Sequence, residues 1–252
     1  MSVTVSLINN KGGVGKTTTA IHLADGSQRE DNDVLLIDLD AQGSASLALG
    51  CDSMEPSIGA VLYDDVDPRE VIRTPPGSEI DLITGASSLK NADIRLSQEY
   101  GREQLLTDAL DPLEDQYDMI LLDCPPSLSL LPVNAIVASD YFVVPVEPEY
   151  LALEGIGSLL DTTREIREGI GTAAELLGIV VAQADFRANS TGQIIEILRE
   201  EHGEAVFDTV IRGNVRVSEA ASYGVPVYEH APSSTGAKAY SDLTEEFLHR
   251  LQ

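Results

Sequence analysis

The sequence has few of the residues that build basic, aromatic or cysteine-rich proteins. Its 252 residues include no tryptophan and only two cysteines. Cys51 and Cys124 form no C-x-x-C pair, which excludes a disulfide scaffold and a cysteine metal site. The chain starts with a strand pattern rather than a basic leader, and no apolar run approaches the roughly 18 residues of a membrane span. We therefore expect a cytoplasmic protein that does not act on membranes.

Basic residues are also scarce, at 16 against 42 acidic ones, which gives a formal net charge of -26. The lysines are Lys11, Lys16, Lys90 and Lys238, and two of them share one short glycine-rich segment. We hypothesise a high-salt cytosol of the halophilic archaeal type, where acidic surfaces hold water and salt screens their repulsion. An ordinary acidic protein is the alternative, and unfolding on dilution into low salt would favour the first.

A glycine-rich loop lies between an apolar strand pattern at residues 3–8 and a helical pattern. The loop and the helix start read Asn10, Lys11, Gly12, Gly13, Val14, Gly15, Lys16, Thr17 and Thr18. Glycines allow positive φ and a close approach, so that backbone N–H groups can point at an anion. Lys16 can bind the β- and γ-phosphates, and the Thr17 hydroxyl can ligate Mg²⁺. The segment from Lys11 to Thr18 is therefore the predicted binding site for ATP.

The loop departs from the usual G-x-x-x-x-G-K-[ST] pattern, because Asn10 replaces the first glycine and Lys11 follows it. In this respect it resembles the deviant Walker A ATPases, the family of ParA and Soj partition proteins, MinD and the nitrogenase iron protein. The resemblance implies that Lys11 reaches across a dimer to the other subunit's phosphates. The alternative is a surface lysine beside a chance glycine turn, which the strand before the loop and the helix after it disfavour.

Three aspartates follow apolar strands that should be buried on both faces. Asp38 and Asp40 end the run from Val34, and Asp123 ends the run from Tyr117. The carboxyl ends of parallel strands form the active-site edge of such sheets, so these acids should lie beside the loop. Asp123 matches a Walker B acid, which can hold Mg²⁺ through its water shell. By resemblance Asp38 joins that shell and Asp40 positions the attacking water; simple solvation of the strand ends is the alternative.

Apolar runs and helical patterns alternate along the chain, which predicts a doubly wound α/β fold with a mostly parallel sheet, as one domain over residues 1–252. Further strands are expected at 80–84, 140–146, 177–182 and 206–211. Further helices are expected at 102–110, 151–166, 191–201 and from about 236 to the end.

The C-terminal segment resembles the chromosomal Soj/ParA group. Ser234 to Tyr240 matches its S-K-G-A-K-A-Y motif, whereas Arg212-Gly213 stands where that group has Pro-Arg. The resemblance places the nucleotide base near this segment, with Arg212 or Asp185 as candidate contacts. It also suggests Arg187, Arg212 and Arg216 as a local DNA-binding patch, although scattered surface arginines are the alternative and a charge of -26 opposes binding to DNA.

The leading hypothesis is a Mg²⁺-dependent partition ATPase for chromosome or plasmid segregation. The resemblance implies an ATP-dependent homodimer that binds DNA without sequence preference, associates with the nucleoid and hydrolyses ATP when a ParB-like centromere-binding protein stimulates it. No helix-turn-helix precedes the loop, so operator binding is not expected. The alternative is a MinD-like positioning ATPase acting on a membrane or a protein cargo, but the chain shows no basic amphipathic C-terminal helix. An iron–sulfur carrier is disfavoured by the missing cysteine pair.

Overall fold

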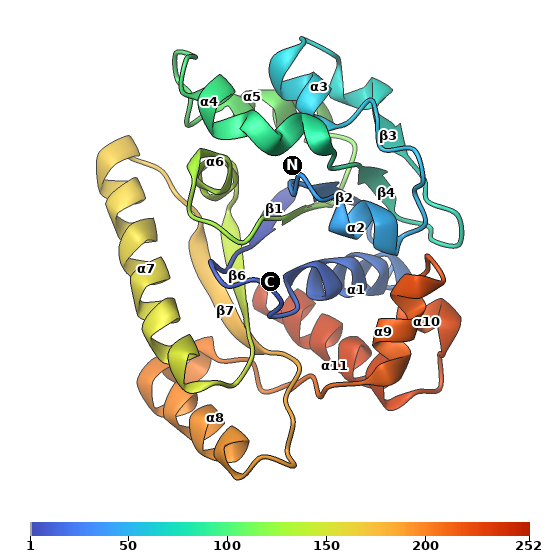
Figure 1. The fold of residues 1–252 in the computed structure, drawn as a ribbon, viewed down its shortest axis with the longest axis vertical. Helices are drawn as coiled ribbons and strands as arrows, with labels where there is room; N and C mark the ends of the chain where they lie inside the picture. Colours follow the sequence, from blue (N-terminus) through green and yellow to red (C-terminus); the bar gives the residue numbers. More distant parts are fainter. Residues whose placement is uncertain (1) are drawn as a thin grey trace.

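The computed structural model describes residues 2–252, apart from the side chains of residues 151 and 189. Seven strands form one sheet in the order β3-β4-β2-β5-β1-β6-β7 (Figure 1). Neighbouring strands are parallel except for the edge pair β3 and β4. The strands are β1 (Val3–Leu7), β2 (Val34–Asp38), β3 (Ile72–Arg73), β4 (Asp81–Ile83), β5 (Met119–Asp123), β6 (Tyr141–Val146) and β7 (Glu175–Val181).

Helices cover both faces of the sheet, as expected for a doubly wound fold. They are α1 (Lys16–Arg29), α2 (Ser44–Ala48), α3 (Ile58–Tyr63), α4 (Ala92–Leu96), α5 (Leu105–Leu110), α6 (Leu130–Val137), α7 (Tyr150–Ile170), α8 (Asn189–His202), α9 (Val215–Ser222), α10 (Val227–His230) and α11 (Thr235–Arg250). Short 3-10 turns lie at Pro68–Glu70, Ser87–Asn91, Asp111–Leu113 and Gly203–Ala205. Across residues 2–252, no helix combines the length and the apolar character needed to cross a bilayer.

Two hydrophobic clusters, one on each face, hold the layers together. One cluster packs α3 to α8 against one side of the sheet, and the other packs α1, α2 and α9 to α11 against the opposite side. Figure 1 shows α1 and α11 lying along each other on the second face. Their close approach depends on Gly26, because a Cβ there would lie 2.3 Å from the Thr244 Oγ1 atom. The predicted fold class is confirmed.

The central strands bring the predicted acidic residues to one edge. β1 lies between β5 and β6, and β2 pairs with β5 on its other side. The register aligns Leu7 with Asp123 and Asp123 with Asp38, so the three strands end at the same level. Because β1 continues into the glycine loop, both carboxylates meet that loop at the carboxyl edge.

The expected strand at 206–211 is wrong. The segment forms only isolated bridges, from Val206 to Ile179 of β7 and from Arg212 to Ala184 beyond the end of β7. The backbone N–H groups of residues 208 and 209 instead donate to the Glu246 carboxylate of α11, at 2.8 and 2.9 Å. The Phe207 and Ile211 N–H groups still donate to the Ile179 and Val181 carbonyls of β7, but the Glu246 carboxylate interrupts the ladder between them.

Other differences concern short or strongly apolar elements. The edge strand β3 and the helix α6 have no counterpart among the predicted elements. The sequence of α6 is apolar nearly throughout, so it carries no amphipathic period. The helix expected from residue 102 begins only at Leu105, after a turn at Gly101 that has a φ of 63°.

Candidate functional site

The glycine loop connects β1 to α1 and supplies the groups expected of a phosphate site. Gly13 and Gly15 have φ values of 79° and 90°, a region that residues with a Cβ rarely occupy. Gly15 precedes the first residue of α1, so the helix N-terminus opens on the loop. The Asn9 side chain fixes the base of the loop, because it accepts from the Lys11 N–H and donates to the Pro145 carbonyl.

Lys16 is a nearly buried cation at the start of α1. Only 6% of the residue is exposed, and its Nζ donates to the Lys11 carbonyl at 2.9 Å. Burial lowers the pKa of Lys16, and the nearby Asp123 partly offsets this effect. A buried ammonium with a neutral acceptor is incompletely compensated, so an anion bound in the loop would be favoured.

Lys11 engages two carboxylates of its own chain beyond the end of β6. Its Nζ lies 2.6 Å from Glu149 Oε2 and 3.5 Å from Glu147 Oε2. The hydrogen bond to Glu149 raises the pKa of Lys11, against the opposing effect of burial. The side chain is 40% exposed, so it can exchange these partners for others at the surface.

Asp123 is the least compensated charge of the site. It is 1% exposed, and within residues 2–252 neither carboxylate oxygen has a hydrogen-bond partner. Burial raises the pKa of Asp123 well above its ordinary value, the facing Asp38 raises it further, and Thr17 and Lys16 act in the opposite direction. An unpaired buried carboxylate beside a hydroxyl is an environment that stabilises a bound cation.

Asp38 is oriented by three hydrogen bonds. Its Oδ1 accepts from the Asp40 N–H at 3.0 Å, and its Oδ2 accepts from the Ser46 N–H at 3.0 Å and the Ser46 hydroxyl at 2.8 Å. Burial raises the pKa of Asp38, and these bonds oppose the rise. Ser46 is fully buried and also accepts from the Gly85 N–H. Sequence reasoning missed Ser46, whose signal was its place in the segment that follows Asp40.

Asp40 stays partly exposed at the mouth of the site, where its Oδ1 accepts from the Gln42 N–H at 2.9 Å. Gly85 packs directly against the Asp38–Asp40 segment. A Cβ at Gly85 would lie 2.5 Å from the Asp40 carbonyl oxygen and 2.7 Å from that of Asp38, so a side chain there would displace both acids. The backbone thus presents Asp40 toward the loop at a fixed position.

The residues predicted to hold Mg²⁺ offer an incomplete set of oxygen ligands. Thr17, Asp38 and Asp123 supply a hydroxyl and two carboxylates, which suit a hard cation. In the part of the chain that the structure describes, no group of three or more His, Cys, Asp or Glu side chains could hold a metal unaided. Mg²⁺ commonly completes its shell with waters and substrate phosphates, so these residues fit an ion that arrives with a nucleotide.

A cavity of about 190 Å³ lies beside the loop. It is lined by residues from the loop, from α1 and from the segment that follows β7, among them Thr17, Thr18, His22, Gln183, Arg212, Gly213, Asn214 and Tyr240. The Asn214 amide is already engaged, since it accepts from the Arg216 N–H and donates to the Thr235 hydroxyl. Arg212 lines this cavity, whereas Asp185 lines the neighbouring hollow.

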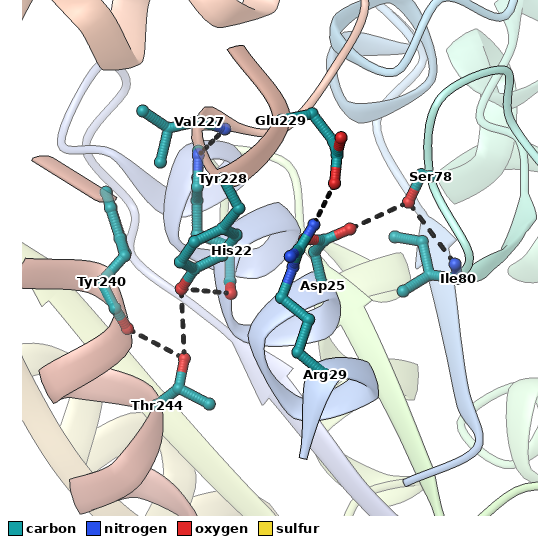
Figure 2. Close-up of polar contacts among 10 residues, drawn as sticks. All are labelled: His22, Asp25, Arg29, Ser78, Ile80, Val227, Tyr228, Glu229, Tyr240 and Thr244. Carbon is teal, nitrogen blue, oxygen red and sulfur yellow. Dashed lines mark hydrogen bonds and ion pairs between the residues drawn. The ribbon is translucent and has the colours of Figure 1, made fainter. Parts of the chain in front are cut away.

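His22 connects the first turns of α1 to the C-terminal helices (Figure 2). Its Nδ1 lies 2.6 Å from the Thr18 carbonyl, its Nε2 accepts from the Val227 N–H at 3.0 Å, and its ring stacks on Tyr240. Accepting at Nε2 requires a neutral ring, and burial lowers the pKa of His22 to about 4. Further along α1, Asp25 and Arg29 join Ser78 and Glu229 in the same view.

We expect His22 to make the folded state sensitive to acid. Its pKa is near 6.5 unfolded and about 4 folded, so its contribution is complete above pH 6.5 and is lost as pH falls toward 4. That difference corresponds to about 3 kcal/mol. Urea unfolding of wild type and His22→Gln at several pH values measures it, and the variant should lose less stability across this range. Equal losses would contradict the assignment.

The three arginines predicted to contact DNA follow β7 in the sequence, before α8 and at or before the start of α9. Arg212 stacks over Phe186, which adjoins Arg187 in sequence. Arg187 makes a bidentate pair with Asp185, and Arg216 pairs with Glu219 at 2.7 Å. Side chains of Asp185, Arg187 and Glu219 line one hollow of about 620 Å³. Arg187 and Arg216 are thus each paired with a nearby acid, and the DNA-binding patch stays a prediction.

Comparisons with known proteins identify the family of the chain. A family model described as an AAA domain matches residues 2–176. The chain is 43% identical to the chromosome-partitioning ATPase Soj of Thermus thermophilus over 248 residues, covering 98% of this chain and 96% of the relative. It is 39% identical to the sporulation initiation inhibitor protein Soj of Bacillus subtilis, with 98% of both chains covered.

Solved structures show the same fold. Cobyrinic acid a,c-diamide synthase from Mycobacterium smegmatis, with bound ADP and magnesium, has a TM-score of 0.87 and 28% identity over 100% of this chain and 96% of that chain. The cell division ATPase MinD of Pyrococcus furiosus has a TM-score of 0.79 at 23% identity, covering 100% of both chains, and supports the fold alone. From these matches, the chain belongs to the Soj/ParA family of chromosome-partitioning ATPases.

Proposed function

We propose that this site binds ATP with Mg²⁺ and hydrolyses it, as one step in moving DNA. The observation that carries the proposal is the presence of two buried and only partly compensated charges beside the loop, Lys16 and Asp123. In a bound magnesium–triphosphate complex, the phosphates would be the anion near Lys16 and Mg²⁺ would be the cation near Asp123. Uncompensated charges at a shared pocket are typical of functional sites.

Each residue has a role that follows from its position. The N–H groups of the loop and of the start of α1 hold the phosphates, and Lys16 neutralises their charge. Thr17, Asp38 and Asp123 would hold Mg²⁺, which draws electron density from the phosphate oxygens when bound. Asp40 is exposed enough to contact and orient a water at the mouth of the site.

The proposal includes a dimer in which Lys11 acts on the partner's nucleotide. The Lys11 ammonium lies at the surface and is held by Glu147 and Glu149, which are both partly exposed. A cation brought in by a second subunit would stabilise charge on the transferring phosphoryl group, as an arginine finger does. Hydrolysis then depends on assembly, which a ParB-like partner would control.

We propose that this dimer binds DNA and is located on the nucleoid. A dimer would carry two copies of Arg187, Arg212 and Arg216. Asp185 and Glu219 compete with DNA phosphates for Arg187 and Arg216. Binding without sequence preference requires only phosphate contacts, which weaken as salt rises. Any DNA affinity should therefore depend on dimer formation.

The test uses Asp40→Ala, which should bind ATP, hydrolyse it about 10²-fold more slowly because the attacking water is no longer oriented, and accumulate as a dimer. We would measure co-sedimentation of this variant with non-specific DNA over a range of KCl concentrations, from low to multimolar, with and without ATP. Binding should require ATP and should fall when Arg187→Ala is added. Arg164→Ala, at an exposed ion pair on α7, is the matched control and should leave binding unchanged.

Other results would change the proposal in defined ways. Normal turnover by Asp40→Ala would remove Asp40 from catalysis. ATP-dependent dimers that ignore DNA would favour a MinD-like positioning role on a protein or membrane cargo. Failure of the wild-type chain to bind ATP would contradict the proposal as a whole.

A further inference from the structure

Gln183 has a backbone conformation that is costly for its residue type. Its φ is 55°, in the left-handed region. The other non-glycine residues with positive φ within 2–252 are Asp31 and Asp65, and aspartate tolerates this region better because its short polar side chain can bond locally. Backbone strain of this kind persists where the surroundings enforce it, and it is frequent at functional sites.

The strain lies where the chain leaves the sheet. Gln183 follows the end of β7, between two residues that are both anchored by backbone hydrogen bonds. Ala182 donates to the Val146 carbonyl at 2.8 Å, and Ala184 donates to the Ile211 carbonyl at 3.0 Å. The left-handed residue between them redirects the chain from the sheet toward the segment at 211–214, which lines the cavity beside the glycine loop.

This conformation brings the Gln183 side chain onto the glycine loop. Its Nε2 donates to the Gly13 carbonyl at 2.5 Å. The same amide also covers Gly15, since a Cβ at Gly15 would lie 3.4 Å from Gln183 Nε2. The contact therefore joins two glycines of the loop, both at positive φ, to the end of β7.

The contact has a consequence for anion binding. In a trans peptide the carbonyl and the following N–H point in opposite directions, so fixing the Gly13 carbonyl also fixes the Val14 N–H. Glycine-rich backbone is otherwise free to rotate, and each N–H that must be oriented on binding reduces affinity. A side chain that fixes this peptide in advance favours phosphate binding.

We propose that Gln183 is a positioning residue for the phosphate site, which orients the peptide between Gly13 and Val14 for the nucleotide's phosphates. The inference rests on the proposed function, because it assumes that the loop binds ATP. Gln183, at the end of β7, lies outside the loop motif from Lys11 to Thr18, so the motif itself does not predict this role. The next residue, Ala184, bonds to the backbone of Ile211 and Gly213, so Gln183 lies between the glycine loop and the cavity wall at 211–214.

The test compares equilibrium binding of a fluorescent ATP analogue with thermal stability. Gln183→Met keeps the length of the side chain but removes the donor, and Gln183→Asn keeps an amide that is too short to reach. Loss of one hydrogen bond should weaken binding by roughly three- to tenfold in both. The melting temperature of Gln183→Asn should equal or exceed that of wild type, because asparagine tolerates positive φ. If Gln183 only stabilised the fold, its replacement would not weaken ATP binding while keeping or raising the melting temperature.

Gln116→Met is the matched control, because the exposed Gln116 side chain also donates to a backbone carbonyl, that of Pro112, at 2.8 Å. It should bind the analogue as wild type does. Affinity within twofold of wild type in both Gln183 variants would overturn the inference while leaving the proposed function intact. A fall in melting temperature without a change in affinity would also overturn it. Absence of binding in wild type would instead contradict the proposed function.

Discussion

Replacing Asp123 with asparagine should make the nucleotide-free protein more stable and remove nearly all ATP hydrolysis. The carboxylate is buried and neither oxygen has a hydrogen-bond partner within the described chain, so the folded state bears a desolvation cost that the nearby Lys16 and Thr17 offset only in part. Relief of such a cost contributes about 1–4 kcal/mol, which would raise the melting temperature by roughly 2–16 °C. Loss of the acid predicted to hold Mg²⁺ should lower turnover by roughly 10³-fold.

Calorimetry without nucleotide and a phosphate-release assay check the two halves of this prediction. Asp25→Asn is the control, since Asp25 is buried to the same degree but bonds to Arg29 at 2.7 Å and to Ser78 at 3.2 Å. That variant should be destabilised by about 1–3 kcal/mol, because it weakens a satisfied network. If Asp123→Asn also lowered the melting temperature, the buried carboxylate would have a compensating partner in solution. The prediction would then be wrong.

The main strands and the loop could be predicted because their signals are local. The runs that end at Asp38 and Asp123 are apolar up to the final aspartate, as is typical of strands buried on both faces, and the run that ends at Leu7 places Thr4 and Ser6 between Val3, Val5 and Leu7. Gly13 and Gly15 of the loop have positive φ, a region that other residue types rarely occupy. At such positions the residue type alone predicts the local structure.

The residues that the sequence did not reveal depend on distant partners. Glu246, on α11, accepts hydrogen bonds from the backbone of residues 208 and 209 and so interrupts a strand at 206–211. His22 acquires its structural role only through its contacts with Val227 and Tyr240. Gln183 resembles any surface glutamine until its backbone angle and its contact with Gly13 are known. Long-range hydrogen bonds leave no periodic pattern, so these contacts required the three-dimensional arrangement.

Lys11→Ala should lose ATP-dependent dimerisation and lower hydrolysis by roughly 10³-fold, as removal of an arginine finger does, while the monomer still binds ATP. Lys16→Ala should instead lose nucleotide binding, because Lys16 is buried at the loop and Lys11 is 40% exposed. Light scattering and binding of an ATP analogue separate the two defects. Lys90→Ala, an exposed lysine outside the site, should change neither measurement. Identical defects at Lys11 and Lys16 would argue against action across a dimer.

Mixing two inactive variants tests the transfer of Lys11 between subunits directly. Lys11→Ala keeps Asp40, and Asp40→Ala keeps Lys11. In a mixed dimer, the site of the Lys11→Ala subunit has its own Asp40 and receives Lys11 from its partner, so hydrolysis should return at that site. If Lys11 acts within its own chain, each site lacks one group and the mixture stays inactive. The pairs with Glu147 and Glu149 hold Lys11 within its own chain, so recovered activity would show that assembly exchanges these partners for phosphate.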